Sequence, residues 1–112
     1  MILMREVILR KSKSKNKKFD VILESKTISF GQLPYEHYTD GLGYKGHLDK
    51  ERRDNYEKRH RTIGEFKNIM TPSFWAYRLL WLKPTIREAI KDIEDKFNVK
   101  IKIENKFMTK MT

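Results

Sequence analysis

The segment Phe74–Leu82 limits what this chain can fold into more than any other feature of the sequence. It is apolar at every position except Arg78. Thr71-Pro72 precedes it, a pair typical of a helix N-terminus, so we expect a helix over Ser73–Leu82. A helix that is apolar on nearly every side must be buried, and this one is far shorter than the ~20 residues that span a bilayer. The segment is therefore predicted to lie in the core of a folded domain.

A second helix is predicted directly after this segment. Thr85–Glu88 has the pattern of a capping box, and Asn98 is expected to end the helix. Arg78 is expected either to reach solvent or to pair with an acid such as Glu88. The apolar residues of the second helix recur at helical spacing: Ile86, Ile90, Ile93 and Phe97.

Three short strands are predicted near the start of the chain. Apolar and polar residues alternate around Val7 and Leu9, again over Phe19–Leu23, and again over Thr27–Phe30. Such alternation is typical of half-buried strands. Ser25-Lys26 is expected to turn the chain, and the short connections predict an antiparallel meander.

The remaining segments complete a prediction of the fold class. Residues 31–48 have no helical or strand period and hold four of the five glycines, so we expect a long loop of the kind that is usually functional or mobile. Val99–Ile103 predicts a short last strand. We therefore expect a single α+β domain over residues 1–112, with a small N-terminal antiparallel sheet of about three strands packed against about three C-terminal helices. Residues 105–112 are expected to be a frayed tail.

The charge of the chain restricts the classes of partner. The formal net charge is +10 and the sequence pI is about 9.8, as in many nucleic-acid-binding proteins. The basic excess is spread along the chain, so a positive face must be assembled by folding. The absence of cysteine excludes disulfides and thiolate metal sites. The start, MILMREVILR, is too short and too charged for a signal peptide, so we expect a soluble protein that is not secreted.

The segment Asp49–Arg61, DKERRDNYEKRHR, is predicted to form a densely charged helix capped by Asp49. Its acids and bases recur four residues apart in the stabilising order, in the pairs Asp49–Arg53, Asp54–Lys58 and Glu57–Arg61. Lys50, Arg52 and Arg59 are less compensated, and Tyr56 lies between the two arginines. A face of this kind binds phosphate and stacks on bases. The alternative is a helix that faces solvent or another protein.

The segment from Lys11 to Lys18 is the second basic cluster. It contains no acid and is predicted to form a hairpin tip that probes phosphates, with a merely solubilising turn as the alternative. Together, the two clusters give these candidate nucleic-acid-binding residues: Lys11, Lys13, Lys15, Lys17, Lys18, Lys50, Arg52, Tyr56 and Arg59.

Three histidines, His37, His47 and His60, raise the question of a metal-dependent nuclease. No two of them have the spacing that supports ligation of one metal. GLGYKG, at Gly41–Gly46, lacks the ending of a phosphate-binding loop. We therefore assign no catalytic residue, no metal and no cofactor, and keep a histidine-metal nuclease only as a third hypothesis.

Several motifs resemble a family of small basic proteins of unknown function, encoded by nucleocytoplasmic large DNA viruses. The resemblance covers about residues 17–97, and Gly41–Gly46 looks like an insertion relative to it. The motifs are SFG at Ser29–Gly31, YTD at Tyr38–Asp40, H-x-D at His47–Asp49, RRDNYEKRHR at Arg52–Arg61, WAYRLLWLKPTI at Trp75–Ile86 and IKDIEDKF at Ile90–Phe97. The resemblance implies a viral origin and a role in the virion or with the genome, and it supplies no catalytic residues.

Two functional hypotheses follow from the residues and the resemblance. The first is a non-enzymatic viral accessory protein that binds the phosphate backbone of DNA or RNA weakly and without sequence specificity, in the virion or in the host cytoplasm or viral factory. The second is a structural or interaction protein, such as a minor capsid or scaffold component, whose charges meet an acidic protein surface. The second predicts self-association and an exposed apolar patch near Trp75 or in the loop Leu33–Leu48. Neither hypothesis involves a membrane.

Overall fold

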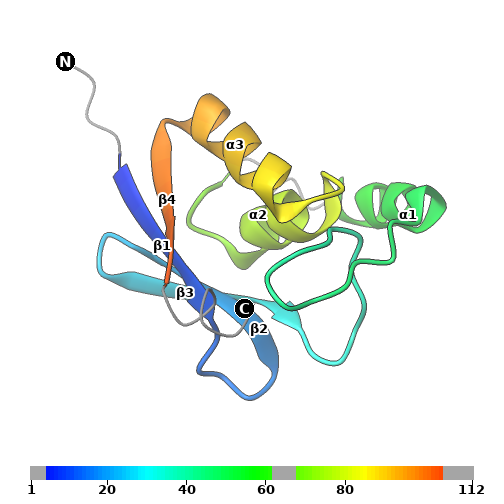
Figure 1. The fold of residues 1–112 in the computed structure, drawn as a ribbon, viewed down its shortest axis with the longest axis horizontal. Helices are drawn as coiled ribbons and strands as arrows, with labels where there is room; N and C mark the ends of the chain where they lie inside the picture. The colour runs from blue at the N-terminus through cyan, green and yellow to red at the C-terminus, as the bar shows by residue number, and fades with distance from the viewer. Residues whose placement is uncertain (1–4, 62–67, 105–112) are drawn as a thin grey trace.

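A four-stranded sheet with helices on one face forms the described part of the chain, which comprises residues 5–61 and 68–104 of a computed structural model (Figure 1). Its spatial order is β3-β2-β1-β4. The β1–β2 and β2–β3 pairs are antiparallel, whereas β4 lies parallel to β1. The predicted α+β class is confirmed, and the predicted last strand joins the same sheet. The strands are β1 (Arg5–Lys11), β2 (Lys17–Leu23), β3 (Lys26–Gln32) and β4 (Val99–Ile103).

The turn between β2 and β3 lies one residue earlier than predicted. Glu24 and Ser25 have φ values of 52° and 66°, and Leu23 pairs with Lys26. Two successive positive φ values are the conformation of the two-residue hairpin turns that match strand twist. Lys26 therefore belongs to the strand and not to the turn.

The helices begin and end close to the predicted residues. Asp49 Oδ1 accepts hydrogen bonds from the N–H groups of Glu51 and Arg52, as a helix N-cap does. Thr71 and Thr85 cap the later helices in the same way. Asn98 adopts the left-handed conformation typical of a helix end (φ 54°). The helices are α1 (Lys50–Arg61), α2 (Pro72–Ala76), the π-helix η1 (Tyr77–Trp81) and α3 (Ile86–Phe97).

The core lies between the sheet and the helices α2, η1 and α3. Trp75 of α2 and Ile93 of α3 are fully buried against the inward residues of the strands, among them Val7, Phe19 and Val99. α2 contacts β3, and α3 contacts both β4 and η1. The prediction that the Phe74–Leu82 segment is buried is confirmed for Phe74, Trp75, Tyr77, Leu79 and Leu80.

The helix predicted over Ser73–Leu82 widens into a π-helix in its second half. The N–H of Leu82 donates to Tyr77 O, five residues back, at 3.0 Å. At the end of the widened turn, Leu80 O accepts hydrogen bonds from two backbone N–H groups of the preceding loop, those of Tyr38 and Thr39 (3.0 and 2.9 Å). Carbonyls at a helix end need such outside partners.

The loop over residues 33–49 is thereby fastened to the helices. Asp40 N donates to Pro84 O, and Ile86 N donates to Asp40 O. Gly46 packs so closely that an added Cβ would lie 2.2 Å from Tyr38 O. A long loop without its own regular structure was the prediction. The sequence did not indicate its backbone hydrogen bonds to Leu80 of η1 and to Pro84 and Ile86 beyond it.

Of the two alternatives for Arg78, pairing with an acid is confirmed, but the acid is Asp92, at 3.5 Å, and not the suggested Glu88; the guanidinium also lies over the ring of Phe97. Two of the ion pairs predicted within α1 are wrong. Among the described side chains, neither Asp49–Arg53 nor Asp54–Lys58 is an ion pair. Asp49 caps the helix instead, and Arg53 lies 3.9 Å from Glu57.

The predicted tail, residues 105–112, and the side chain of Arg61 lie outside the described residues, so the frayed end and the Glu57–Arg61 pair stay predictions. Within the described ranges, none of the helices has the length and apolar character needed to cross a membrane.

Candidate nucleic-acid interface

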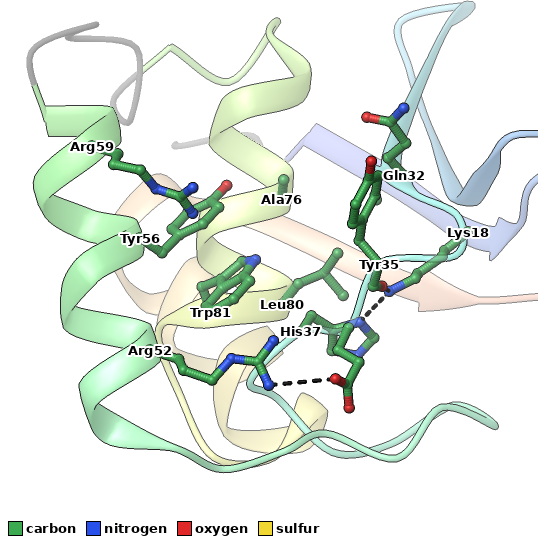
Figure 2. Close-up of a pocket in the computed structure, with 12 residues that line it drawn as sticks. Lys18, Gln32, Tyr35, His37, Arg52, Tyr56, Arg59, Ala76, Leu80 and Trp81 are labelled. Atoms are coloured by element: carbon green, nitrogen blue, oxygen red, sulfur yellow. Dashed lines mark hydrogen bonds and ion pairs between the residues drawn. The ribbon is translucent and has the colours of Figure 1, made fainter.

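A pocket of about 430 Å³ separates α1 from the sheet and brings together parts of both predicted basic clusters (Figure 2). One wall is α1, the opposite wall is the loop that follows β3, and the base is formed by α2, η1 and the start of β2. Its lining residues are Lys18, Gly31, Gln32, Tyr35, Glu36, His37, Arg52, Tyr56, Arg59, Ala76, Leu80 and Trp81.

The α1 wall of the pocket is the helix face predicted to contact nucleic acid. Arg52, Tyr56 and Arg59 all line the pocket, as their spacing on a helix predicts. The Arg52 guanidinium reaches across the pocket to Glu36 on the loop, at 3.4 Å. Both side chains of this pair are about half exposed or more (46% and 68%), so the pair contributes little stability.

Aromatic stacking holds α1 in place. The ring of Tyr56 stacks on Trp81 of η1, with centroids 4.3 Å apart and planes at 6°, and also on His60 (4.1 Å). Burial raises the pKa of Tyr56 to about 12. Tyr56 was predicted to stack on nucleic-acid bases, but its ring is already engaged by two neighbours and serves to dock the helix.

A second attachment of α1 involves Tyr77 of η1. Its hydroxyl donates to Glu57 Oε1 at 2.6 Å, and the guanidinium of Arg53 lies over the ring of Tyr38 at 5.6 Å. Burial, together with the Glu57 carboxylate, raises the pKa of Tyr77, so the hydroxyl remains a donor. These contacts compensate for the small apolar surface that this charged helix offers.

Lys18 does not lie in the hairpin tip, and this part of the prediction is wrong. β2 begins at Lys17, and Lys18 is only 4% exposed. Its amine donates to the carbonyl of Tyr35 and to His37 Nδ1 (2.8 Å for the latter). Burial lowers the pKa of Lys18, against the opposing charge of Glu36. Lys18 thus lies inside the fold at the bottom of the pocket and is not a surface probe.

His37 is held in one tautomer by this contact. An ammonium group has no acceptor, so Nδ1 of His37 must be the acceptor and the ring must be neutral. Burial, reinforced by the charge of Lys18, lowers the pKa of His37 to about 4. His47 also accepts through Nδ1, from the N–H of Asp49. Among the described residues, no group of three or more His, Asp and Glu side chains is arranged to hold a metal ion.

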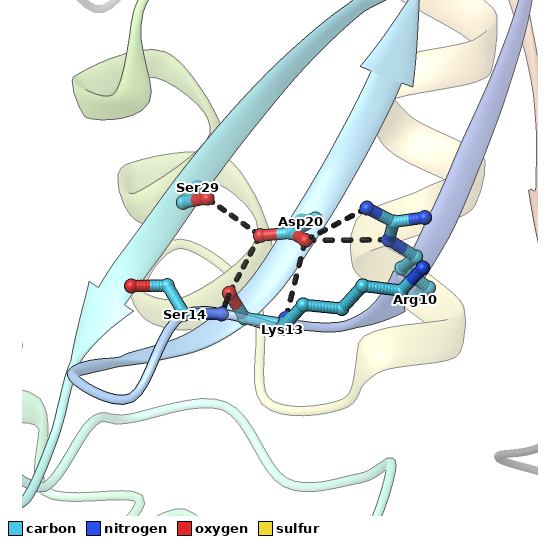
Figure 3. A network of polar contacts seen from close by, with 6 residues as sticks. Arg10, Lys13, Ser14, Asp20 and Ser29 are labelled. Atoms are coloured by element: carbon cyan, nitrogen blue, oxygen red, sulfur yellow. Dashed lines mark hydrogen bonds and ion pairs between the residues drawn. The ribbon is translucent and has the colours of Figure 1, made fainter.

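The hairpin turn between β1 and β2 is organised by one buried carboxylate, that of Asp20 (Figure 3). Asp20 is 2% exposed and accepts from the hydroxyls of Ser12 and Ser29, each at 2.6 Å. It also pairs with Arg10 at 3.2 Å and accepts from the N–H of Lys13. Burial alone would raise the pKa of Asp20, but these hydrogen bonds outweigh it and lower the pKa.

The structure therefore groups the nine predicted residues in three ways. Lys18, Arg52, Tyr56 and Arg59 line the pocket. The hairpin beside the pocket carries Lys11, Lys13, Lys15 and Lys17. Lys17 lies opposite Gln32, a residue of the pocket lining, in the register of β2 and β3. Lys50 is exposed at the start of α1 but does not line the pocket.

Sequence reasoning missed the loop wall of the pocket. Tyr35, Glu36 and His37 are adjacent in the sequence, and only the folded loop places them opposite α1. A cluster of aromatic, acidic and histidine residues inside a glycine-containing loop was the one available signal. Trp81 was correctly predicted to be helical, and the structure shows that it lies in the π-helix and stacks on Tyr56.

Comparison with known protein families gives a match over the first half of the chain. Residues 7–60 match the model of a family of unknown function (DUF5754). This range runs from β1 to the last turn of α1, so it contains the segment Lys11–Lys18, all but the last residue of Asp49–Arg61, and the loop wall of the pocket. No curated protein and no solved structure matches the chain.

Proposed function

We propose that this protein binds DNA or RNA through the phosphate backbone, weakly and without sequence specificity. The supporting observation is that the two basic segments, which are more than 30 residues apart in the sequence, adjoin in the fold. Lys17 of the hairpin pairs with Gln32, and Gln32 lines the pocket whose opposite wall carries Arg52 and Arg59. Adjoining cations along one path are what a nucleic-acid backbone requires.

The biological setting of the proposal rests on sequence resemblance. The resemblance of the motifs to a family encoded by large DNA viruses favours a viral accessory protein, associated with the genome or the virion and acting in the host cytoplasm or viral factory. The match of residues 7–60 to a family of unknown function is compatible with this setting. The proposed activity is binding alone, without a chemical step.

Fluorescence anisotropy of labelled oligonucleotides at two salt concentrations tests the proposal. We expect binding at low salt that weakens as the salt concentration rises. In a plot of the logarithm of the binding constant against the logarithm of the salt concentration, each phosphate contact should steepen the slope by about 0.9. The variant Lys13→Ala/Lys15→Ala should reduce both affinity and slope. Lys91→Ala/Lys100→Ala is the matched control, because it removes the same charge from exposed positions on α3 and β4. Equal losses in the two variants, or no binding at low salt, would refute the proposal.

A structural or interaction role is the second candidate, and one observation favours it. Trp75 is fully buried, but the loop exposes Leu33, Tyr35 and Leu48 at 36%, 65% and 48%. Exposed apolar side chains of this kind are typical of protein contacts when they are contiguous. Light scattering after size-exclusion chromatography distinguishes the candidates, because self-association that Leu33→Ser/Leu48→Ser abolishes would support the second.

A further inference from the structure

We infer that the pocket between α1 and the loop receives one unpaired nucleotide, so that the protein prefers single strands to duplexes. This inference rests on the proposed nucleic-acid binding and specifies the form of the nucleic acid. Its basis is the combination, in one cavity, of a buried cation, two arginines and an exposed aromatic ring.

The bottom of the pocket offers a hydrogen-bond donor to an anion. An ammonium group carries three N–H donors. Lys18 gives two of them to Tyr35 O and His37 Nδ1, and among the described residues the third has no hydrogen-bond acceptor. A phosphate oxygen in the pocket would accept it and would also compensate the buried charge.

The α1 wall offers the arginines needed to hold the same phosphate. Arg52 is already directed into the pocket, where it contacts Glu36 at 3.4 Å. That ion pair is exposed and weak. A phosphate that accepts two hydrogen bonds from the Arg52 guanidinium can therefore replace the Glu36 carboxylate. Arg59 lies two helical turns after Arg52 on the same face of α1 and lines the same pocket (Figure 2).

The loop wall offers a ring for the base. Tyr35 lines the pocket on the side opposite Tyr56 and Trp81 (Figure 2), and it is 65% exposed. Unlike Tyr56, it has no aromatic partner among the described residues. Stacking of a base on such a ring is tolerant of sequence, which agrees with binding that lacks base specificity.

The size of the pocket suits an unpaired nucleotide. Its volume of about 430 Å³ falls within the range of small-molecule sites. A base in a duplex is stacked on its neighbours and must be extruded, at a cost in free energy, before it can enter such a pocket. The next phosphates of a strand that leaves the pocket past Gln32 would meet Lys17 and the hairpin lysines.

The test compares a fluorescein-labelled oligodeoxythymidine with a blunt-ended duplex of the same length at low salt. We expect the single strand to bind at least about tenfold more tightly. Tyr35→Ala should weaken single-strand binding by at least about fivefold and leave duplex binding unchanged. Lys13→Ala is the control, because it should weaken both substrates by a similar factor.

Three outcomes separate the inference from the proposed function. Equal affinity for the two substrates, or a Tyr35→Ala effect of the same size on both, overturns the inference while leaving nucleic-acid binding intact. Absence of binding to either substrate overturns the proposed function itself. Arg52→Gln is the second pocket variant. The Arg52 side chain is exposed in the native fold. The substitution should also weaken single-strand binding more than duplex binding.

Discussion

The two basic segments of this protein are held in place by opposite means. The hairpin turn is organised by polar contacts that converge on the buried carboxylate of Asp20. The helix α1 is docked by aromatic rings, through Tyr56 on Trp81, with one short hydrogen bond from Tyr77. A lysine-rich turn has no apolar groups to bury, so only hydrogen bonds can fix it. A helix with one tyrosine on its inner face can instead be held by the apolar surface that the ring buries and by ring stacking.

The largest expected effect comes from removing the aromatic support of α1. Trp81→Ala should lower the free energy of unfolding by about 4 kcal/mol, because it deletes a large, partly buried ring and the Tyr56 stack. Denaturant titration measures the loss, and hydrogen exchange should show that α1 amides lose more protection than those of β2. Tyr35→Ala removes an exposed ring from the same pocket and should cost less than about 0.5 kcal/mol.

Removing the carboxylate that organises the hairpin should have the next largest effect. Asp20→Ala should cost about 3 kcal/mol, because Ser12, Ser29 and the partly buried Arg10 lose their common acceptor. The folded pKa of Asp20 is lowered, so its contribution is present above the unfolded pKa and is lost as pH falls through the folded pKa. Denaturation curves of wild type and Asp20→Asn should therefore converge in strong acid. A difference that persists there would show that the carboxylate charge is unimportant.

The contact of Lys18, at the end of the hairpin segment, with His37 of the loop predicts a pH effect of similar size. The folded pKa of His37 is about 4, below the 6.5 of the unfolded chain. Between these values the unfolded state binds more protons, so stability should fall as pH drops from 6.5 to 4, by about 3 kcal/mol in total. The variant His37→Gln lacks this titration and should show a shallower pH dependence in thermal unfolding. An unchanged slope would mean that His37 is protonated in the fold.

The smallest of the four effects sharpens the comparison. Tyr77→Phe keeps the ring and removes the hydroxyl that donates to Glu57, so it should cost about 1.5 kcal/mol. If α1 is docked mainly by aromatic rings, the loss must be clearly smaller than that of Trp81→Ala in the same denaturant titration. A loss of equal size would make the hydrogen bond, and not the stack, the main attachment.

Much of the fold was predictable because its local signals agree with the tertiary structure. Thr71, Thr85 and Asp49 cap helices as their residue types favour, and Asn98 ends α3 in the left-handed conformation. Alternating strands and the Phe74–Leu82 segment were recognisable from the spacing of apolar residues. The π-turn was not predictable, since a shift from four- to five-residue bonding depends on what the freed carbonyls meet.

The candidate site was predictable only in part. Helical spacing alone places Arg52, Tyr56 and Arg59 on one face, and the structure keeps them together. Lys18 shows the limit of the same reasoning. It is one of a run of similar lysines, and nothing in the run distinguishes the residue whose amine reaches Tyr35 and His37 from its exposed neighbours.

By itself, the sequence determined the α+β class, the helix ends, the buried segment and the presence of two basic clusters, because each depends on residues close together in the chain. The tertiary structure alone decided that β4 lies parallel to β1, that the loop is fastened to Leu80, and that Tyr56 supports α1. It also decided that Lys18 and Arg52 share one pocket. These outcomes depend on contacts between distant segments, whose geometry is fixed only when the core packs.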